Sequence, residues 1–358
     1  MKRIGVLNSG GDCPGLNAVI HGVVGAASQM GIEVVGIKYG FEGLLAPASY
    51  RVLTPADTIG ILQQGGTILG TTNKGHFISK LGMGTPEEIS KGIIENARGT
   101  MQQLSLDALV VIGGDGSLTT ALQLYRAGFP VVGVPKTIDN DLLATARTFG
   151  FDSACAMVVD ALDRLQTTAQ SHERVMVLEV MGRHAGWIAM WGGIAGGANV
   201  ILIPELEYDL DKVADFIKQR DADGYKSTLV VVAEGAHLPE GGLSTRSGSA
   251  GAEVRLGGIG EIIAQELEVR TGKDTRACVL GHLQRGGQPT ALDRIIGARF
   301  GVKAVKLAAE GGFGRMVSYD AYRVVSVPIE EAVHQLRRVQ DNGEIVETAR
   351  AIGIHLGQ

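Results

Sequence analysis

Two aspartates separated by one asparagine follow directly after a short apolar run. The segment from Pro135 to Asp141 reads PKTIDND and carries Asp139 and Asp141. Carboxylates this close at the exposed end of a strand repel each other unless a cation or an acceptor hydroxyl separates their roles. One of them can then hold a metal ion while the other takes a proton as general base. The alternative is a solvated loop that carries no chemistry.

Two glycine-rich segments lie between an apolar run and a helical pattern. Residues 8–17 read NSGGDCPGLN and residues 113–117 read GGDGS. Glycines let phosphate oxygens reach backbone N–H groups, and a helix N-terminus favours the anion. With a Mg–nucleotide bound, Asp115 would meet the metal, and the phosphate oxygens would contact Gly114, Gly116 and Ser117. The first segment is neither a P-loop nor a GxGxxG fingerprint, and for both segments the alternative is a tight turn.

Cationic and polar residues recur near the ends of apolar runs in the second half of the chain. They are Arg174, Met181, Gly182, Arg183, Glu234 and Arg276, together with His282 and Arg285 in the segment GHLQRGG. The guanidinium fork matches phosphate oxygens, so arginines gathered in this way suit a sugar phosphate. For each residue alone, a surface ion pair is the alternative, and His282 could be a core histidine.

Apolar runs alternate with amphipathic segments and predict an α/β fold with parallel sheets. Runs rich in Val and Ile predict strands buried on both faces at 4–7, 34–37, 108–112, 131–134, 175–180, 200–203 and 228–233. The clearest helical pattern spans 152–168. Residues 239–252, rich in Gly and Ser, are expected to form a surface insertion. Ligands are expected where strand carboxyl ends meet helix N-termini.

Composition narrows the class of protein. The 358 residues suggest about two domains, and 52 of them are glycine, about twice the ordinary share. A net charge of −5 with 5% aromatics argues against nucleic-acid or anionic-membrane partners. Three scattered cysteines are typical of reduced thiols in the cytoplasm. The uncharged stretch 185–204 contains five glycines and favours a packed helix and strand over a membrane span.

The ordered motifs SGGDCPGLN, GGDGS, PKTIDND, MGRHAG and GHLQRGG resemble those of the 6-phosphofructokinase family, from about residue 3 to residue 330. The resemblance implies two three-layer α/β domains with mostly parallel sheets. A donor-nucleotide domain would comprise residues 1–140 plus about 260–312. A sugar-phosphate domain would comprise about 141–259 plus 313–358.

The resemblance also implies the chemistry, which is transfer of the γ-phosphoryl of Mg-ATP to the 1-hydroxyl of fructose 6-phosphate. Asp139 would be the general base, with Thr137 and Arg183 as further catalytic residues and Asp115 and Asp141 at the Mg²⁺. The nucleotide would be bound by Gly11, Lys74, Gly114, Asp115, Gly116 and Ser117. The sugar phosphate would be bound by Thr137, Ile138, Asp139, Arg174, Met181, Gly182, Arg183, Glu234, Arg276, His282 and Arg285. Arg174 and Arg276 would complete a neighbouring subunit's site, so a homotetramer, or else a dimer, is expected.

The choice of phosphoryl donor depends on two positions. Pyrophosphate-using members of the family resemble this chain at Lys136 but carry Asp where Gly116 stands, so Gly116 favours ATP. Asn73 replaces an arginine that is typical of bacterial ATP-using members, and Lys74 or Lys136 is expected to take its role. A pyrophosphate-dependent enzyme is the alternative within the family. A non-catalytic sugar-phosphate sensor is the alternative outside it, but it would be expected to lack Asp139, Asp115 or Arg183.

Overall fold

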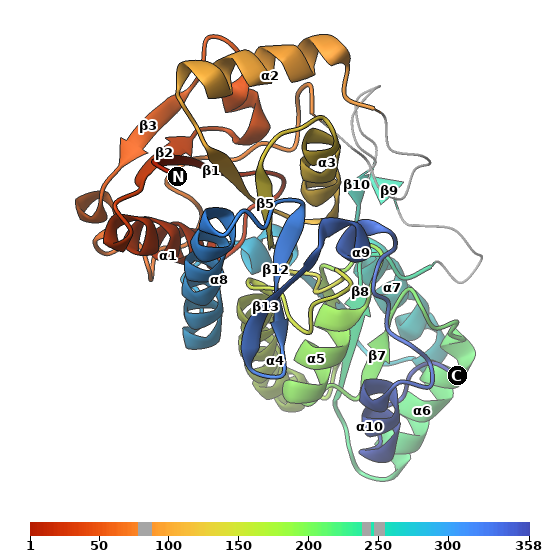
Figure 1. The fold of residues 1–358 in the computed structure, drawn as a ribbon. Coiled ribbons are helices and arrows are strands. Elements are labelled where there is room, and N and C mark those ends of the chain that lie inside the picture. Colours follow the sequence, from red (N-terminus) through yellow and green to blue (C-terminus); the bar gives the residue numbers. More distant parts are fainter. Residues whose placement is uncertain (78–87, 238–244, 247–254) are drawn as a thin grey trace. The chain divides into compact units, whose positions relative to one another are not determined.

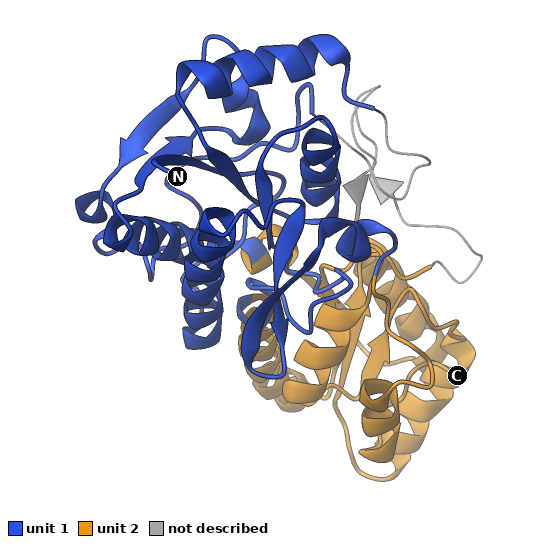
Figure 2. Ribbon diagram, viewed as in Figure 1, with its two compact units in different colours: residues 1–153, 285–336 blue, residues 154–284, 337–358 orange. Residues whose placement is uncertain are grey.

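The chain folds into two α/β units, each with its own sheet and apolar core. The computed structural model describes residues 1–77, 88–237, 245–246 and 255–358. Unit 1 contains Met1–Ser153 and Arg285–Leu336, and unit 2 contains Ala154–Gln284 and Arg337–Gln358 (Figure 2). The predicted fold class, two α/β domains with mostly parallel sheets, is confirmed.

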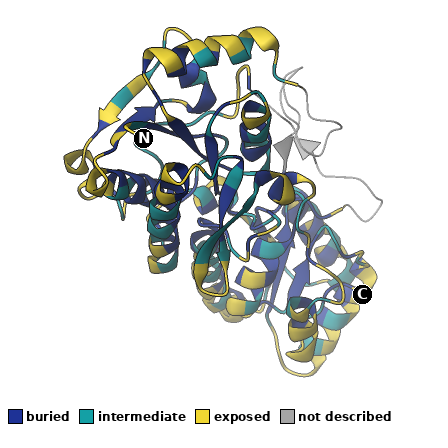
Figure 3. Cartoon of the chain, viewed as in Figure 1, coloured by how far each residue is buried: buried dark blue, intermediate teal, exposed yellow. Residues whose placement is uncertain are grey.

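Within the described residues, the sheet of unit 1 has the order β13-β12-β5-β4-β1-β2-β3 (Figure 1). Its strands are β1 (Arg3–Asn8), β2 (Glu33–Ile37), β3 (Tyr50–Leu53), β4 (Ala108–Gly113), β5 (Val131–Pro135), β12 (Arg315–Asp320) and β13 (Arg323–Pro328). The strands from β12 to β2 are parallel, and β3 and β13 add antiparallel edges. The central strands β4 and β5 are buried along their whole length (Figure 3), as expected for parallel strands with both faces covered.

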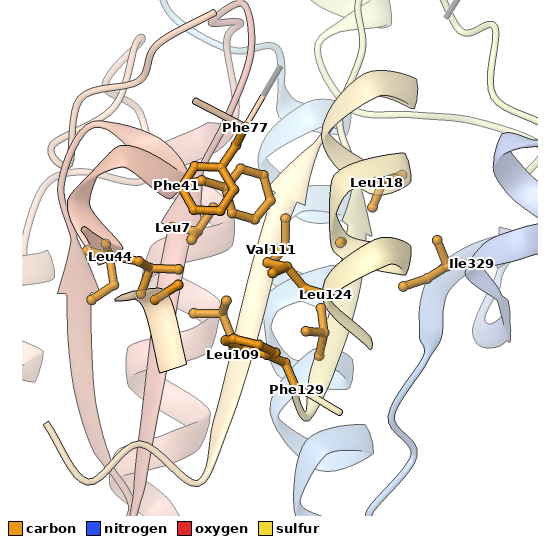
Figure 4. Packing of buried hydrophobic residues seen from close by; sticks show 14 of the residues in the cluster. Leu7, Phe41, Leu44, Phe77, Leu109, Val111, Leu118, Leu124, Phe129 and Ile329 are labelled. Atoms are coloured by element: carbon orange, nitrogen blue, oxygen red, sulfur yellow. The ribbon is translucent and has the colours of Figure 1, made fainter. Parts of the chain in front are cut away.

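Helices and the apolar side chains between them complete unit 1. The helices are α1 (Leu16–Gln29), α2 (Lys91–Gln103), α3 (Asp115–Arg126), α8 (Ala291–Ala309) and α9 (Ile329–Val333), with 3₁₀ turns η1 (Gly40–Leu44) and η2 (Pro55–Thr58). Leu109 and Val111 of β4 pack against Leu118 and Leu124 of α3 in one buried cluster (Figure 4). This packing holds the N-terminus of α3 at the carboxyl edge of the sheet.

Unit 2 is built on a smaller, all-parallel sheet. Its described strands are β6 (Val175–Val180), β7 (Val200–Leu202), β8 (Thr228–Ala233) and β11 (Thr275–Val279), in the order β11-β6-β8-β7. Its helices are α4 (Phe151–His172, whose first turn belongs to unit 1), α5 (Trp187–Ala195), α6 (Leu210–Ala222), α7 (Ile259–Thr271) and α10 (Glu344–Ala351). A two-residue strand β9 (Thr245–Arg246) pairs antiparallel with β10 (Arg255–Leu256), and η3 (Gly281–Arg285) follows β11.

The observed division of the chain differs from the expected boundaries. Residues 260–284 belong to unit 2, because β11 adds to the sheet of that unit beside β6 and α7 packs on both strands. Residues 313–336 belong to unit 1, because β12 pairs with β5 and β13 with β12. The chain leaves unit 1 after Ser153 and returns to it at Arg285.

The seven predicted strands are present. Besides the two-residue strands β9 and β10, four strands of the described chain have no continuous apolar run in the sequence and were not predicted. The strands β3, β11, β12 and β13 are partly exposed, so their residues mix polar and apolar types. The predicted helix at 152–168 is the core of α4, and the uncharged stretch forms α5 and β7. Within the described residues, no helix is both long and apolar enough to span a membrane. Apart from Thr245–Arg246, the expected insertion at 239–252 lies outside the described residues.

Glycines allow α1 and α8 of unit 1 to cross at backbone distance. A Cβ on Gly22 would lie 2.3 Å from the carbonyl oxygen of Ala298. We expect Gly22→Ala to lower the free energy of unfolding by roughly 1–3 kcal/mol, because the helices must move apart. Gly25 is the control, because it is exposed on the same helix and a Cβ added to it would meet no atom within 4 Å. Gly25→Ala should instead stabilise by about 0.5–1 kcal/mol. Denaturant unfolding measures both, and a neutral Gly22→Ala would contradict this prediction.

Candidate active site

Three loops of unit 1 meet at the carboxyl edge of its sheet. They follow β1, β4 and β5, which are neighbouring parallel strands, and carry residues 9–15, 114–117 and 136–141. Gly114 is the N-cap of α3, and Asp115 is the first residue of that helix. A Cβ on Gly113 would lie 2.2 Å from the Ser117 Cβ. The glycines therefore keep this loop tight against the helix N-terminus, where backbone N–H groups are available to a phosphate.

A fourth segment is fastened to the first glycine loop. The Gly10 N–H donates to the Thr72 carbonyl at 3.0 Å, and the Thr71 hydroxyl donates to the Gly10 carbonyl at 2.7 Å. Lys74, a predicted nucleotide-binding residue, is exposed at the end of this segment. The structure thus brings Lys74 into the same region of unit 1 as Gly11.

Arg285 lies in unit 1, whereas the other cationic residues of its predicted group belong to unit 2. Its guanidinium donates to the Asp12 carbonyl at 3.1 Å and lies 2.9 Å from the position of a Cβ on Gly11. Arg285 therefore adds a positive charge to the first glycine loop.

The acidic residues of the loops after β4 and β5 interact electrostatically. Burial, together with the neighbouring carboxylates Asp139 and Asp115, raises the pKa of Asp141 to about 8. A cation beside these groups would relieve their repulsion. Within the described residues, no three His, Cys, Asp or Glu side chains form a closed metal cluster. Mg²⁺ usually binds one or two carboxylates plus substrate phosphates, so the donor set at Asp115 and Asp141 fits this ion.

Lys136 is a buried cation at the same edge, with 5% of its surface exposed. Its Nζ lies 3.6 Å from the position of a Cβ on Gly10. Burial lowers the pKa of Lys136 and the Arg285 charge adds to this, whereas Cys13, Asp115 and Asp139 oppose it. Burial also raises the pKa of the Cys13 thiol to about 12, so this thiol is neutral near pH 7. The side chain of Lys136 is thus directed toward the phosphate loops and not into solvent.

In unit 2, the loops after β6, β8 and β11 carry a second set of predicted site residues. Met181, Gly182 and Arg183 follow β6, Glu234 follows β8, and His282 lies in η3 after β11. These strands are neighbours in a parallel sheet, so the residues share its carboxyl edge. The Gly235 N–H donates to the Gly182 carbonyl at 3.1 Å, which ties the first two loops together.

Arg174 and Arg276 lie at the opposite edge of that sheet. Arg174 immediately precedes β6, and Arg276 is the second residue of β11. Both contact the carboxylate of Asp274, with Arg276 at 2.6 Å. The length of β6 separates Arg174 from Arg183 by about 20 Å at roughly 3.3 Å per residue. The two arginines are therefore remote from Arg183 within the sheet of unit 2.

Three buried polar residues that support these loops had no predicted role. The Gln284 side-chain carbonyl accepts the Met181 N–H at 2.7 Å and joins two loops of unit 2. In unit 1, Asn140 and Thr148 hydrogen-bond to each other beside Thr137. Gln284 and Asn140 lie inside recognised motifs, so their position was a usable signal. Thr148 lies outside every motif and carries no signal in the sequence.

These features define a class of protein, namely a phosphoryl-transfer enzyme with an α/β fold, phosphate-binding loops and paired carboxylates at strand ends. A family model described as phosphofructokinase matches residues 3–308. The chain belongs to the phosphofructokinase family and is an enzyme.

Curated relatives match along almost the whole chain. The ATP-dependent 6-phosphofructokinase of Chloroflexus aggregans is 54% identical over 357 residues, covering 99% of this chain and 98% of the relative. ATP-dependent 6-phosphofructokinase 1 of Synechocystis is 49% identical, covering 100% and 99%. The pyrophosphate–fructose 6-phosphate 1-phosphotransferase of Amycolatopsis methanolica is 48% identical, covering 94% and 96%.

Solved structures share the fold. Phosphofructokinase from Saccharomyces cerevisiae superposes with a TM-score of 0.79 at 31% identity, covering 93% of this chain. This chain spans only 45% of that yeast chain. A pyrophosphate-dependent phosphofructokinase from Nitrosospira multiformis has a TM-score of 0.81 at 22% identity, covering 100% of this chain and 93% of the neighbour, and supports the fold alone.

Proposed function

We propose that the chain is an ATP-dependent 6-phosphofructokinase. It transfers the γ-phosphoryl of ATP to the 1-hydroxyl of fructose 6-phosphate and yields fructose 1,6-bisphosphate and ADP. The observation that carries the proposal is the convergence, at one edge of unit 1, of two glycine loops with the aspartates that follow β5. The names of the relatives from Chloroflexus and Synechocystis support the reaction.

Each predicted site residue of unit 1 has a proposed role in this reaction. Asp139 takes the proton of the acceptor hydroxyl, which makes the hydroxyl oxygen a stronger nucleophile as phosphoryl transfer begins. The donor phosphates are bound by the loops around Gly11 and Gly114 and by Lys74 and Ser117, while Thr137 orients the transferred group. Asp115 and Asp141 would hold Mg²⁺, which neutralises charge on the phosphate oxygens when bound.

The polar residues of unit 2 bind the acceptor. Fructose 6-phosphate carries a dianionic phosphate, which charge-assisted bonds from arginine recognise well. Arg183 supplies such bonds, and Met181, Gly182, Glu234 and His282 contact other parts of the acceptor. Arg183 also balances charge in the transition state, and in unit 1 Ile138 and Arg285 complete the set.

A homo-oligomer, most simply a tetramer and otherwise a dimer, accounts for Arg174 and Arg276. Both are distant from Arg183 along the sheet of unit 2, so in one chain they have no access to the sugar phosphate that Arg183 holds. In an oligomer, Arg174 and Arg276 of one subunit can instead bind the sugar phosphate held by a neighbouring subunit. The three free cysteines support a reducing compartment, so the proposal includes a cytoplasmic location.

Complementation between two inactive variants tests this arrangement. Asp139→Asn and Arg276→Ala should each be inactive or nearly so. Suppose that each site combines Asp139 of one chain with Arg276 of another. After random mixing at equal amounts, about a quarter of the sites then contain both an intact Asp139 and an intact Arg276. The mixture, dissociated and reassembled, should therefore recover up to about a quarter of wild-type activity. Absence of recovery in oligomers shown to contain both variants would contradict the shared site.

Pyrophosphate is the second candidate donor, favoured by the buried Lys136 and by the relative from Amycolatopsis. ATP is preferred because Gly116 places no charge at the start of α3, where the α-phosphate would lie. A coupled assay with fructose 6-phosphate and either ATP or pyrophosphate decides between the two. We expect turnover with ATP, and turnover with pyrophosphate alone would overturn the assignment.

A further inference from the structure

The loop that carries Asp139 is fastened from within by two side chains that no proposed step of the reaction uses. The Thr148 N–H donates to the Asn140 side-chain oxygen at 2.9 Å. The Thr148 hydroxyl donates to the Thr137 carbonyl at 2.6 Å. Thr148 is fully buried and Asn140 is 3% exposed, so water does not compete for these bonds. These bonds connect Thr137, before Asp139, and Asn140, after it, to the same residue, Thr148.

The backbone of the loop has a rare conformation at Asn140. Asn140 has a φ of +50°, in the left-handed region that residues other than glycine rarely adopt. In this conformation the Asn140 side-chain oxygen faces Thr148. The Asp139 N–H also bonds to the Thr137 side-chain oxygen at 3.1 Å, which closes the turn on the other side. A loop held at both ends keeps the Asp139 carboxylate in one place.

The segment that contains Thr148 is itself anchored in unit 1. Phe149, next to Thr148, is fully buried and forms a parallel bridge with Lys136. On the other side, the Ala146 N–H donates to the Tyr319 carbonyl of β12 at 2.8 Å. Thr148 is thus a rigid support at the sheet, and Asn140 is the side chain that the loop extends to it.

We propose that Asn140 and Thr148 are positioning residues for phosphoryl transfer, acting by holding Asp139 where it can take the proton of the acceptor hydroxyl. The inference rests on the proposed role of Asp139. Neither residue contacts the reacting atoms in this assignment. Their loss should reduce kcat while the Michaelis constants of ATP and fructose 6-phosphate stay nearly unchanged, because most of the proposed phosphate contacts come from the glycine loops of unit 1 and from unit 2.

Four single substitutions separate an effect on the position of Asp139 from a general loss of stability. Thr148→Val keeps the shape of the side chain and removes the hydroxyl, whereas Thr148→Ser keeps the hydroxyl. Asn140→Gly removes the inward side chain but relaxes the left-handed backbone, so lost activity in this variant cannot come from strain at φ. Thr58→Val is the matched control, because Thr58 is a buried threonine of unit 1 whose hydroxyl likewise donates to a backbone carbonyl, that of Pro55, at 3.0 Å.

Steady-state kinetics and melting temperatures of the full-length enzyme provide the test. We expect kcat to fall ten- to a hundredfold in Thr148→Val and Asn140→Gly, in the range for a misplaced reacting group. Both Michaelis constants should change by less than about threefold, as expected when ground-state binding is preserved. Thr148→Ser should restore most of the activity, and Thr58→Val should keep normal kcat with a similar change in Tm.

Three results would overturn the proposal. They are a kcat within twofold of wild type in Thr148→Val, an equal loss in Thr58→Val, and a failure of Thr148→Ser to restore activity. A wild-type enzyme without activity toward fructose 6-phosphate would instead reject the proposed function, so the two failures are distinguishable.

Discussion

Asp139→Asn should lower kcat by a factor on the order of 10² to 10⁴, which is the usual contribution of a general base. The substitution preserves the size of the side chain and removes the group that accepts the proton. Fructose 6-phosphate affinity should remain close to that of the wild type, because the proposed phosphate contacts come from Arg183, its neighbours in unit 2 and Arg285, all of which the substitution preserves. Initial rates and equilibrium binding of the sugar phosphate measure the two effects separately.

The control for Asp139→Asn is Asp160→Asn. Asp160 is an exposed aspartate of α4 that pairs with Arg164 at 2.9 Å, so its neutralisation changes charge without touching either set of loops. This variant should keep normal kcat. A kcat for Asp139→Asn within a factor of ten of the wild type would show that another group takes the proton.

The position of the phosphate loops was predictable because parallel strands share an edge. Each apolar run before a motif becomes a strand of the sheet, and β1, β4 and β5 are neighbours. Their following residues must therefore meet, whatever the lengths of the intervening helices. The same reasoning works in unit 2 for Met181 and Glu234, which follow β6 and β8. Local sequence was enough to predict these positions, because a residue directly after a parallel strand must lie at the carboxyl edge of the sheet.

Local sequence did not predict where the chain passes between units. Arg285 stands three positions after His282, in the same motif. The division between the units falls between Gln284 and Arg285, so Arg285 contacts Gly11 and Asp12 in unit 1. The strand β11 was missed for a related reason, since its residues are only partly buried and show no continuous apolar run. Thr148 could not be found either, because its partners are set by the tertiary fold.

Gly116→Asp should reduce kcat/KM for ATP by a factor on the order of 10² or more. Gly116 is the second residue of α3, at the helix end where we propose that the nucleotide phosphates bind. A carboxylate there would face the α-phosphate, and two like charges about 4 Å apart repel by about 4 kcal/mol at an effective dielectric constant of 20. The fold should tolerate the change, because an acidic residue in the first turn interacts favourably with the helix dipole.

Gly116→Ala separates charge from size in this experiment. It adds a methyl group without charge, so it should lose much less ATP activity than Gly116→Asp. Pyrophosphate has only two phosphate groups and no counterpart of the α-phosphate of ATP. Any turnover with this donor should therefore be reduced less than turnover with ATP. Both variants should melt no lower than the wild type, since each replaces a helical glycine. Equal loss in Gly116→Ala and Gly116→Asp would show that space and not charge excludes the nucleotide, and normal ATP use by Gly116→Asp would remove Gly116 from donor selection.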